Sequence, residues 1–374
     1  MPSPRPSLPF AVTRGANRLT FASAFTAAAL GLGLNLRADA LPETSVTYRV
    51  EQTAVLSDIP ADAKHVKFWV SIPDNERYQD LLDFEVVSAP GQWSVVREPD
   101  RGNRFMLVEV DHPGTDTLAA KVAFTLRRRS VFTELDPTQA GPITDSHRAL
   151  YAEELSQDAP HMEVTPRIAA IAREAAGSET NIATQARLLL AAVADYADHY
   201  SKDPTKPSCG IGDAEDCLTN AGGCCTDLHS MFIAMARARG IPARLQMGYR
   251  LREPNAGKEV DPGYRCWAEY FVPNYGWVSA DIVEADDPQG AGRTRWFTGL
   301  TERRLWLNEG REFQLPGTAH PDERVNTMII GHAEIDGVIA RVLPDEILNR
   351  PAQLSRTVKY TEIPPAQAAT LAVK

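Results

Sequence analysis

Positive charge is scarce in this 374-residue sequence, in which 39 Lys and Arg residues stand against 49 Asp and Glu residues and the formal net charge is −10. Proteins that bind nucleic acid need basic patches that neutralise phosphates. Attachment to anionic lipid surfaces likewise needs clusters of Lys and Arg. The acidic balance therefore argues against both classes, and we expect no nucleic-acid partner.

Long apolar runs are absent after residue 40, so no later stretch predicts a membrane-spanning helix. The one such run, 19–36, follows three Arg residues and precedes the sequence Ala38-Asp39-Ala40, which has the A-x-A form of a signal-peptide cleavage site. A membrane anchor is the alternative, but the run is rich in Ala, Gly and Thr rather than in Leu and Ile. We therefore expect residues 1–40 to be a signal peptide of an exported protein, periplasmic or extracellular, with no stable membrane span after cleavage. Its removal takes away four Arg and one Asp and changes the net charge from −10 to −13.

Cysteine is also rare, and its five residues all lie in the central region: Cys209, Cys217, Cys224, Cys225 and Cys266. In an oxidising compartment an odd number leaves at least one thiol unpaired. A disulfide between Cys217 and either Cys209 or Cys224 would leave Cys225 free. A zinc site is the rival interpretation, but this spacing matches no common ligand set. We expect no metal and no other cofactor.

Residues 222–244, GGCCTDLHSMFIAMARARGIPAR, predict one amphipathic helix. Cys225, His229, Phe232 and Ala236 recur with a period of 3.6 residues. Gly240 suits a left-handed C-terminal cap, and the Pro that follows it cannot continue the helix. The helix N-terminus is expected to favour the thiolate of Cys225 and so to lower its pKa. The alternative is a buried Cys that only packs.

The chain before this helix divides by its periodicity. Residues 45–129 alternate apolar and polar positions between Gly, Pro, Asn and Asp turns, which predicts a β-sandwich domain over 41–130. Helical spacing follows at 166–176 and 181–200, and 203–220 is expected to be a loop. His161 and His199, on or near these helices, are interpreted as structural.

The chain after the helix predicts an antiparallel hairpin between 264–272 and 277–283. Arg265 and Asp281 share a sheet face only if the connecting loop holds an odd number of residues, and 274–276 is such a loop. This register also places Trp267 and Glu269 on that face, and Cys266 on the opposite one, in the core. Further strands of the same sheet are expected at 296–297, 305–307 and 327–330.

Four motifs, in order, resemble the transglutaminase-like superfamily: GCCTDLHS at 223–230, RGIPAR at 239–244, YRCWAE at 264–269 and GWVSAD at 276–281. The resemblance covers about 182–337. It implies an α+β fold in which a papain-like transglutaminase core, an active-site helix packed on an antiparallel sheet, occupies 145–340. The β-sandwich precedes this core, and a C-terminal tail, 341–374, follows it.

The resemblance also implies a Cys–His–Asp triad of the papain type. Cys225 matches the nucleophile and Asp281 the acid, but Arg265 stands where the family has its His, two residues before Trp267. A guanidinium group does not release its proton in proteins, although it can stabilise a thiolate and pair with Asp281. His229 is a possible substitute base, or else a buried hydrogen-bonding residue. Trp267 and Glu269 are expected in the substrate cleft.

Two functions follow from these residues. One is an exported cysteine protease or transglutaminase-type acyl transferase that works through Cys225 on a peptide or protein substrate. The other is a catalytically impaired pseudoenzyme that binds peptide or cell-wall material in the same cleft. The family's chemistry favours the first function, and the Arg at position 265 favours the second.

Overall fold

The computed structural model describes residues 44–208, 211–261, 263–285, 292–342 and 351–371. The expected signal peptide, 1–40, and Cys209 lie outside these residues. Within them, no helix is long and apolar enough to cross a membrane.

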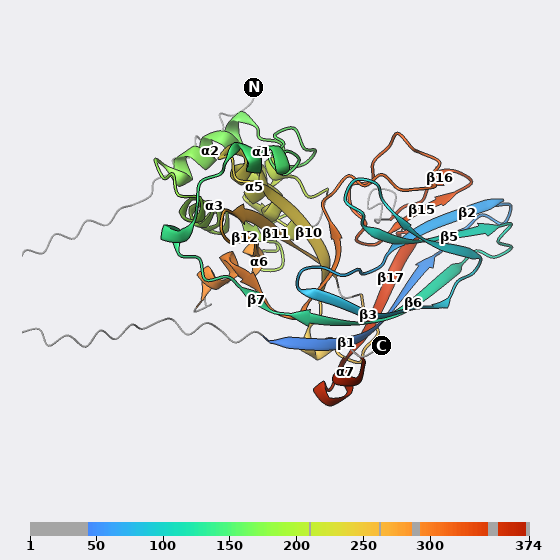
Figure 1. Cartoon of the computed structure of the whole chain (residues 1–374). Helices are drawn as coiled ribbons and strands as arrows, with labels where there is room; N and C mark the ends of the chain where they lie inside the picture. The colour runs from blue at the N-terminus through green and yellow to red at the C-terminus, as the bar shows by residue number, and fades with distance from the viewer. Residues whose placement is uncertain (1–43, 209–210, 262, 286–291, 343–350, 372–374) are drawn as a thin grey trace, which may run out of the picture. The chain divides into compact units, whose positions relative to one another are not determined.

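Two antiparallel sheets form a β-sandwich (Figure 1). One has the order β17-β1-β6-β3, with β1 Ser45–Leu56, β3 Gln79–Ser88, β6 Leu118–Arg129 and β17 Leu354–Ile363. The other has the order β16-β15-β2-β5-β4, with β2 His65–Ser71, β4 Gln92–Arg97, β5 Arg104–Asp111, β15 His332–Ile335 and β16 Val338–Ile339. Apolar side chains of both sheets, such as Val50 of β1 and Phe68 of β2, fill one core. The strands expected in this region are confirmed.

The sandwich takes strands from both ends of the described chain. β17, in the segment expected as a tail, pairs with β1 from Thr47↔Ile363 to Leu56↔Leu354. The expectation of a central-sheet strand at 327–330 is wrong: the nearest strand, β15, pairs with β2 of the sandwich. The alternating apolar pattern of such strands does not say which sheet will bury them. The domain boundaries at 130, 145 and 340 stay a prediction.

The second core confirms the α+β class. Its antiparallel sheet has the order β12-β11-β10-β14, with β10 Ala243–Arg250, β11 Tyr264–Val272, β12 Gly276–Ala280 and β14 Arg304–Glu309. The helices α2 Pro166–Ala176, α3 Ile182–Tyr196 and α5 Cys225–Ala238 pack against it through one shared apolar cluster. The expected strand at 296–297 is instead part of a 3-10 helix, η3 Arg293–Phe297.

Helix α5 ends as predicted, because Gly240 adopts a φ of 72° after its last turn. Its start carries a capping box: Asp227 Oδ2 accepts a hydrogen bond from the Cys224 N–H at 2.8 Å. The expectation of an uninterrupted loop over 203–220 is wrong, since Ala214–Asn220 forms helix α4. Asp213 caps that helix, accepting hydrogen bonds from the N–H groups of Glu215 and Asp216.

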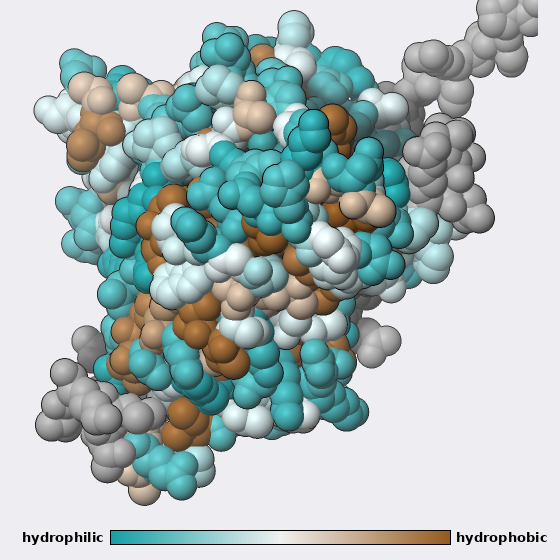
Figure 2. All heavy atoms as spheres, turned by 90° about the vertical axis from the view of Figure 1, so that its right-hand side faces the viewer, coloured by the Kyte–Doolittle hydropathy of each residue, from teal (hydrophilic) through white to brown (hydrophobic). Residues whose placement is uncertain are grey.

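The remaining elements are short: β7 Val131–Phe132, η1 Pro137–Gln139, α1 Asp145–Leu150, β8 Asp198–His199, β9 Gly222–Gly223, η2 Glu253–Asn255, α6 Ile282–Ala285, β13 Gly299–Leu300 and α7 Pro365–Leu371. Figure 2 shows one face of the molecule, on which hydrophilic side chains predominate and apolar ones form small groups between them. That face offers no large continuous apolar surface for a partner.

Candidate functional site

The hairpin of β11 and β12 sets the register of the candidate site. Val272 pairs with Gly276, so three residues, 273–275, form the loop. The odd number is confirmed, although the loop begins one residue earlier than expected. Glu269 therefore pairs with Ser279, whose hydroxyl donates to Glu269 Oε1 at 3.1 Å. Position 281 is two residues after Ser279 and so has the parity of the sheet face that carries Glu269 and Ser279. It lies one residue past the end of β12.

Trp267 and Glu269 are both buried rather than exposed in a cleft. Trp267 is 1% exposed and packs with Leu300 and Trp306. The Glu269 carboxylate accepts two hydrogen bonds from Arg244, at 3.0 and 2.8 Å. The structure thus gives these two predicted cleft residues protein partners in the interior.

Cys225 is the first residue of α5 and is only 3% exposed. Burial raises the pKa of its thiol well above the usual value, and hydrogen bonding with Cys266 acts in the same direction. The Arg265 charge and a hydrogen bond with Cys224 lower that pKa, but less. The prediction of a lowered pKa is therefore wrong, because the cost of burying the charged form outweighs the helix terminus and the cation.

The other described cysteines, Cys217, Cys224 and Cys266, are all buried. Cys217 and Cys266 are free thiols, so a Cys217–Cys224 disulfide is not formed. Cys266 belongs to the core between α5 and the sheet, as predicted. Its Sγ lies 3.5 Å from His229 Nδ1.

His229, for which the sequence left open a substitute base or a buried hydrogen-bonding residue, is fully buried one turn after Cys225. Its Nδ1 donates to the Cys225 carbonyl at 2.6 Å, and its Nε2 accepts from the Ile282 N–H at 3.0 Å. Burial lowers its pKa to about 4, so the ring is neutral at pH 7. Because backbone groups occupy both nitrogens, neither is directed at the Cys225 thiol as a base.

Asp281 lies one residue past the end of β12, and its side chain is fully buried. Its Oδ2 accepts from Arg304 Nη2 at 2.7 Å, and its Oδ1 lies 4.0 Å from His229 Nε2. The nearby cations, Arg304 first and then Arg265, hold the pKa of this carboxyl far below its usual range, against the effect of burial. Asp281 is thus an anion held chiefly by a guanidinium group.

Three guanidinium groups converge on Asp281 and its neighbour on α6, Glu284. The Glu284 carboxylate lies 2.8 Å from Arg250, 2.9 Å from Arg304 and 3.8 Å from Arg265. The sequence allowed Arg265 to pair with Asp281, but the close ion pair of Asp281 is with Arg304. We call Arg250, Arg265, Arg304, Asp281 and Glu284 the arginine cluster. With three cations against two anions, it favours a negative charge near the nucleophile.

His199, interpreted from the sequence as structural, lies beside the start of α5. The short parallel pair β8–β9 aligns it with Gly223, two residues before Cys225. Its Nδ1 accepts a hydrogen bond from the Ser201 N–H at 3.2 Å. Burial lowers its pKa to about 4, and the charges of Arg265 and Lys202 act in the same direction. The D-H-Y sequence at 198–200 gave no signal for this position, because the parallel pairing joins residues far apart in the chain.

Comparisons with known proteins agree with this geometry. The model of the transglutaminase-like superfamily matches residues 169–282, which span α2, α5, β11 and β12. An uncharacterized protein of Haemophilus influenzae is 30% identical over 265 residues, which are 63% of this chain and 69% of that protein. The crystal structure of a "putative cysteine protease" from Cytophaga hutchinsonii superposes with a TM-score of 0.56 at 14% identity, covering 86% of this chain and 92% of the other. The structural likeness extends over the sandwich and the helical core and shows a shared fold.

Proposed function

Because the chain belongs to the transglutaminase-like superfamily and has its papain-like α+β core, we propose that the Cys225 site binds peptide or protein acyl donors but is impaired in turning them over. The proposal rests on one observation. The position where the family has its catalytic imidazole holds Arg265, beside a nucleophile and an acid that are both present. The ancestral chemistry is thiol-based acyl transfer or amide hydrolysis through Cys225.

Each residue of the site has a defined part in this account. The Cys225 N–H, at the first position of α5, has no acceptor within its own helix and can bind a carbonyl oxygen of the substrate. Arg265 and the rest of the arginine cluster stabilise negative charge on that oxygen or on the thiolate. No guanidinium group takes the thiol proton or returns one to a leaving amine. Substrate binding is therefore supported, while breaking the amide bond is slow.

A labelled glutamine-containing peptide amide tests the proposal. We expect saturable binding by fluorescence anisotropy in both the wild type and Cys225→Ala, with neither hydrolysis nor incorporation of an amine above the Cys225→Ala background. Turnover by the wild type that Cys225→Ala abolishes would refute the impairment. Absence of binding in both proteins would refute the peptide site.

An active enzyme is the second candidate, and the position of His199 favours it. An imidazole beside Gly223 and in the field of Arg265 can carry a proton that the Arg cannot. If His199 does so, the wild type turns over and His199→Gln removes at least about 100-fold of the rate, whereas His161→Gln, at a partly exposed His near α4, leaves it unchanged. Equal rates of wild type and His199→Gln exclude this route.

Export of the protein is a separate part of the proposal, carried by the charged start, apolar run and A-x-A sequence of residues 1–40. N-terminal sequencing of protein released by a bacterial host is expected to begin at Leu41. A mature protein that keeps residues 1–40 would contradict export by cleavage.

A further inference from the structure

Arg265 is a buried cation whose side chain donates no hydrogen bond to any residue that the structure describes. The side chain is 9% exposed, and its one ion pair within 4.0 Å among the described residues is a long one, with Glu284 at 3.8 Å. A guanidinium group carries five N–H donors. Burying such donors without acceptors is costly, so the position is receptive to a ligand that supplies oxygen atoms.

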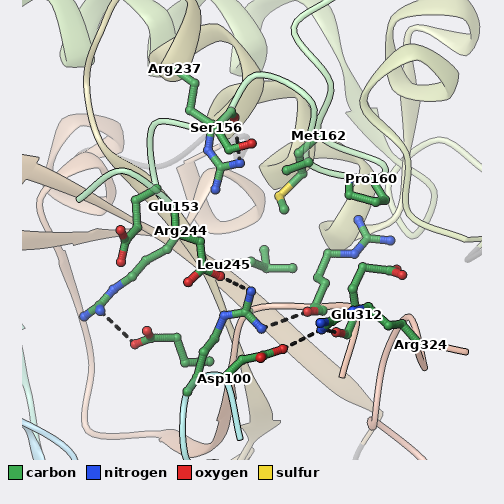
Figure 3. Close-up of a pocket in the computed structure, with 16 residues that line it drawn as sticks. Asp100, Glu153, Ser156, Pro160, Met162, Arg237, Arg244, Leu245, Glu312 and Arg324 are labelled. Carbon is green, nitrogen blue, oxygen red and sulfur yellow. Dashed lines mark hydrogen bonds and ion pairs between the residues drawn. The ribbon is translucent and has the colours of Figure 1, made fainter. Parts of the chain in front are cut away.

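Two other buried guanidinium groups show how this fold usually satisfies such donors. Arg311 is 1% exposed, and all five of its N–H groups donate to carbonyl, hydroxyl and amide oxygens. Arg237, in the wall of a cavity beside the C-terminal end of α5 (Figure 3), donates to the carbonyl oxygens of Ser156 and Ala243. Arg265 differs from both, because the protein fixes its position without satisfying its donors.

The two carboxylates of the arginine cluster are each held by another cation. Asp281 Oδ2 accepts from Arg304 at 2.7 Å, and the two Glu284 oxygens lie 2.8 and 3.2 Å from the two terminal nitrogens of Arg250. Both carboxylates also act on Arg265 at longer range and, against the effect of burial, raise its pKa. Three cations against two anions still leave one positive charge, and Arg265 is the cation without hydrogen bonds.

Strand β11 brings Arg265 to the first turns of α5. The side chain of Cys266, the next residue, lies 3.6 Å from Thr226 Oγ1 and 3.5 Å from His229 Nδ1, both on that helix. The Cys225 N–H at the helix start has no acceptor within α5. The positive end of the helix therefore acts together with the Arg265 charge in attracting an anion.

These donors distinguish a carboxylate from an amide. The fork of a guanidinium group matches the two oxygens of a carboxylate, and such paired, charge-assisted hydrogen bonds are strong. An amide offers one oxygen and turns an NH₂ group, itself a donor, toward the fork. A carboxylate is also what hydrolysis of an amide leaves, either at a peptide C-terminus or on a deamidated Gln side chain.

We propose that Arg265 makes the Cys225 site a receptor for peptide carboxylates. The carboxylate of a C-terminus or of a Glu side chain pairs with the Arg265 fork beside Cys225, and no bond to the thiol forms. This inference rests on the proposed peptide-binding function and adds the end group that the site prefers.

Fluorescence anisotropy with one N-terminally labelled glutamine peptide in three forms tests the preference. The forms are the peptide amide, the same peptide with a free C-terminal carboxylate, and the peptide amide with Glu in place of Gln. We expect at least one carboxylate form to bind about ten- to hundred-fold more tightly than the peptide amide, and the tighter one identifies the source of the carboxylate. If the amide binds and neither carboxylate form binds more tightly, the carboxylate site is overturned and the peptide site stands. If no form binds, the peptide site itself is refuted.

Variants of Arg265 show whether this residue carries the preference. Arg265→Gln is expected to bring the carboxylate forms to the affinity of the peptide amide, whereas Arg265→Lys keeps the charge without the fork and should keep a smaller preference. Cys225→Ala and Arg187→Gln, which removes an exposed cation of α3, should keep the wild-type preference. Thermal transitions show which variants are folded. An undiminished preference in the folded Arg265 variants, or its loss in Cys225→Ala or Arg187→Gln, would overturn the assignment.

Discussion

At the scale of single residues, burial decides the protonation of Cys225. The thiol is enclosed by protein, and the cost of burying a thiolate exceeds the help from Arg265. We expect iodoacetamide to alkylate Cys225 at pH 7.5 at least about ten-fold more slowly than a free thiol of pKa about 8.5. Mass spectrometry of the Cys225 peptide measures the rate, and Cys225→Ser is the control that identifies the peptide.

Arg265 offers a matched change for the same measurement. Because its charge favours the thiolate, Arg265→Gln is expected to raise the pKa of Cys225 further and slow alkylation again. Two results would contradict this account of the thiol. One is an alkylation rate that, plotted against pH, has its midpoint below about 8.5 in the wild type, and the other is faster alkylation in Arg265→Gln.

His229 gives a prediction for stability. Burial lowers its folded-state pKa to about 4 from 6.5, so the unfolded chain takes up a proton that the folded chain refuses. Stability is therefore lost as the pH falls from about 6.5 toward 4, by about 3 kcal/mol when complete. Urea denaturation of wild type and His229→Gln between pH 7 and pH 4.5 measures this, and the variant is expected to lose less. If the free energy of unfolding changed with pH equally in the two proteins, the result would count against a neutral, buried His229 ring.

The sequence predicted some of these residues and not others, for a physical reason. Cys225 and Asp281 lie in local motifs, so their positions could be recognised without the fold. Arg304 reaches Asp281 through the order β12-β11-β10-β14, which brings β14 to the site across the sheet. No local pattern around Arg304 gives that order.

At the scale of elements, the start of α5 depends on Asp227. One carboxylate oxygen caps the Cys224 N–H, and the other accepts from the Asp213 N–H at 2.9 Å. Asp227→Ala is expected to lower the free energy of unfolding by about 1–2 kcal/mol, because it removes both bonds. Urea denaturation measures the loss, with Glu174→Ala on the exposed face of α2 as the control. Equal losses in the two variants would show that the cap contributes nothing.

The sequence predicted an element correctly where residues close together in the chain determine it. The ends of α5, and the odd loop between β11 and β12, follow from Gly, Pro and turn residues. The chain before α5 also needs glycine, since Gly223 has a φ of 155° and a Cβ there would lie 2.7 Å from Asp227 Oδ2. Helix α4 was missed because its seven residues lie among Pro and Gly, although Asp213 and the acidic residues after it are a capping signal.

At the scale of the whole molecule, the sandwich depends on the C-terminal strand. Leu354, Val358 and Tyr360 of β17 are at most 1% exposed. Burying each such side chain contributes about 1.5–3 kcal/mol, so the three together rival the 5–15 kcal/mol that stabilises a typical domain. We expect deletion of 353–374 to give an insoluble protein or one without a cooperative thermal transition. Deletion of 365–374 should shift the melting temperature by only a few degrees.

Similar thermal transitions for the two truncated proteins would contradict this role of β17.

The strand could not be assigned from the sequence, because its partner β1 lies about 300 residues earlier and its alternation fits any half-buried sheet. The all-β character of 45–129 was predictable, whereas closure of the sandwich by later strands was not.

The central claim is that the Cys225 site lacks a group that can accept and return a proton at position 265. Arg265→His supplies that group between Cys225 and Asp281. General acid–base catalysis contributes about 100- to 10,000-fold in rate, and the hold of Arg304 on Asp281 places the expected gain near the lower end.

The decisive measurement is therefore kcat/KM on a fluorogenic peptide amide for wild type, Arg265→His and Arg265→His with Cys225→Ala, each shown to be folded by its thermal transition. The account predicts at least about a 100-fold gain in Arg265→His, with a pH optimum set by the new imidazole, and its loss in the double variant. A wild type that already turns over and is slowed by Arg265→His, or a folded Arg265→His with no gain, would contradict it.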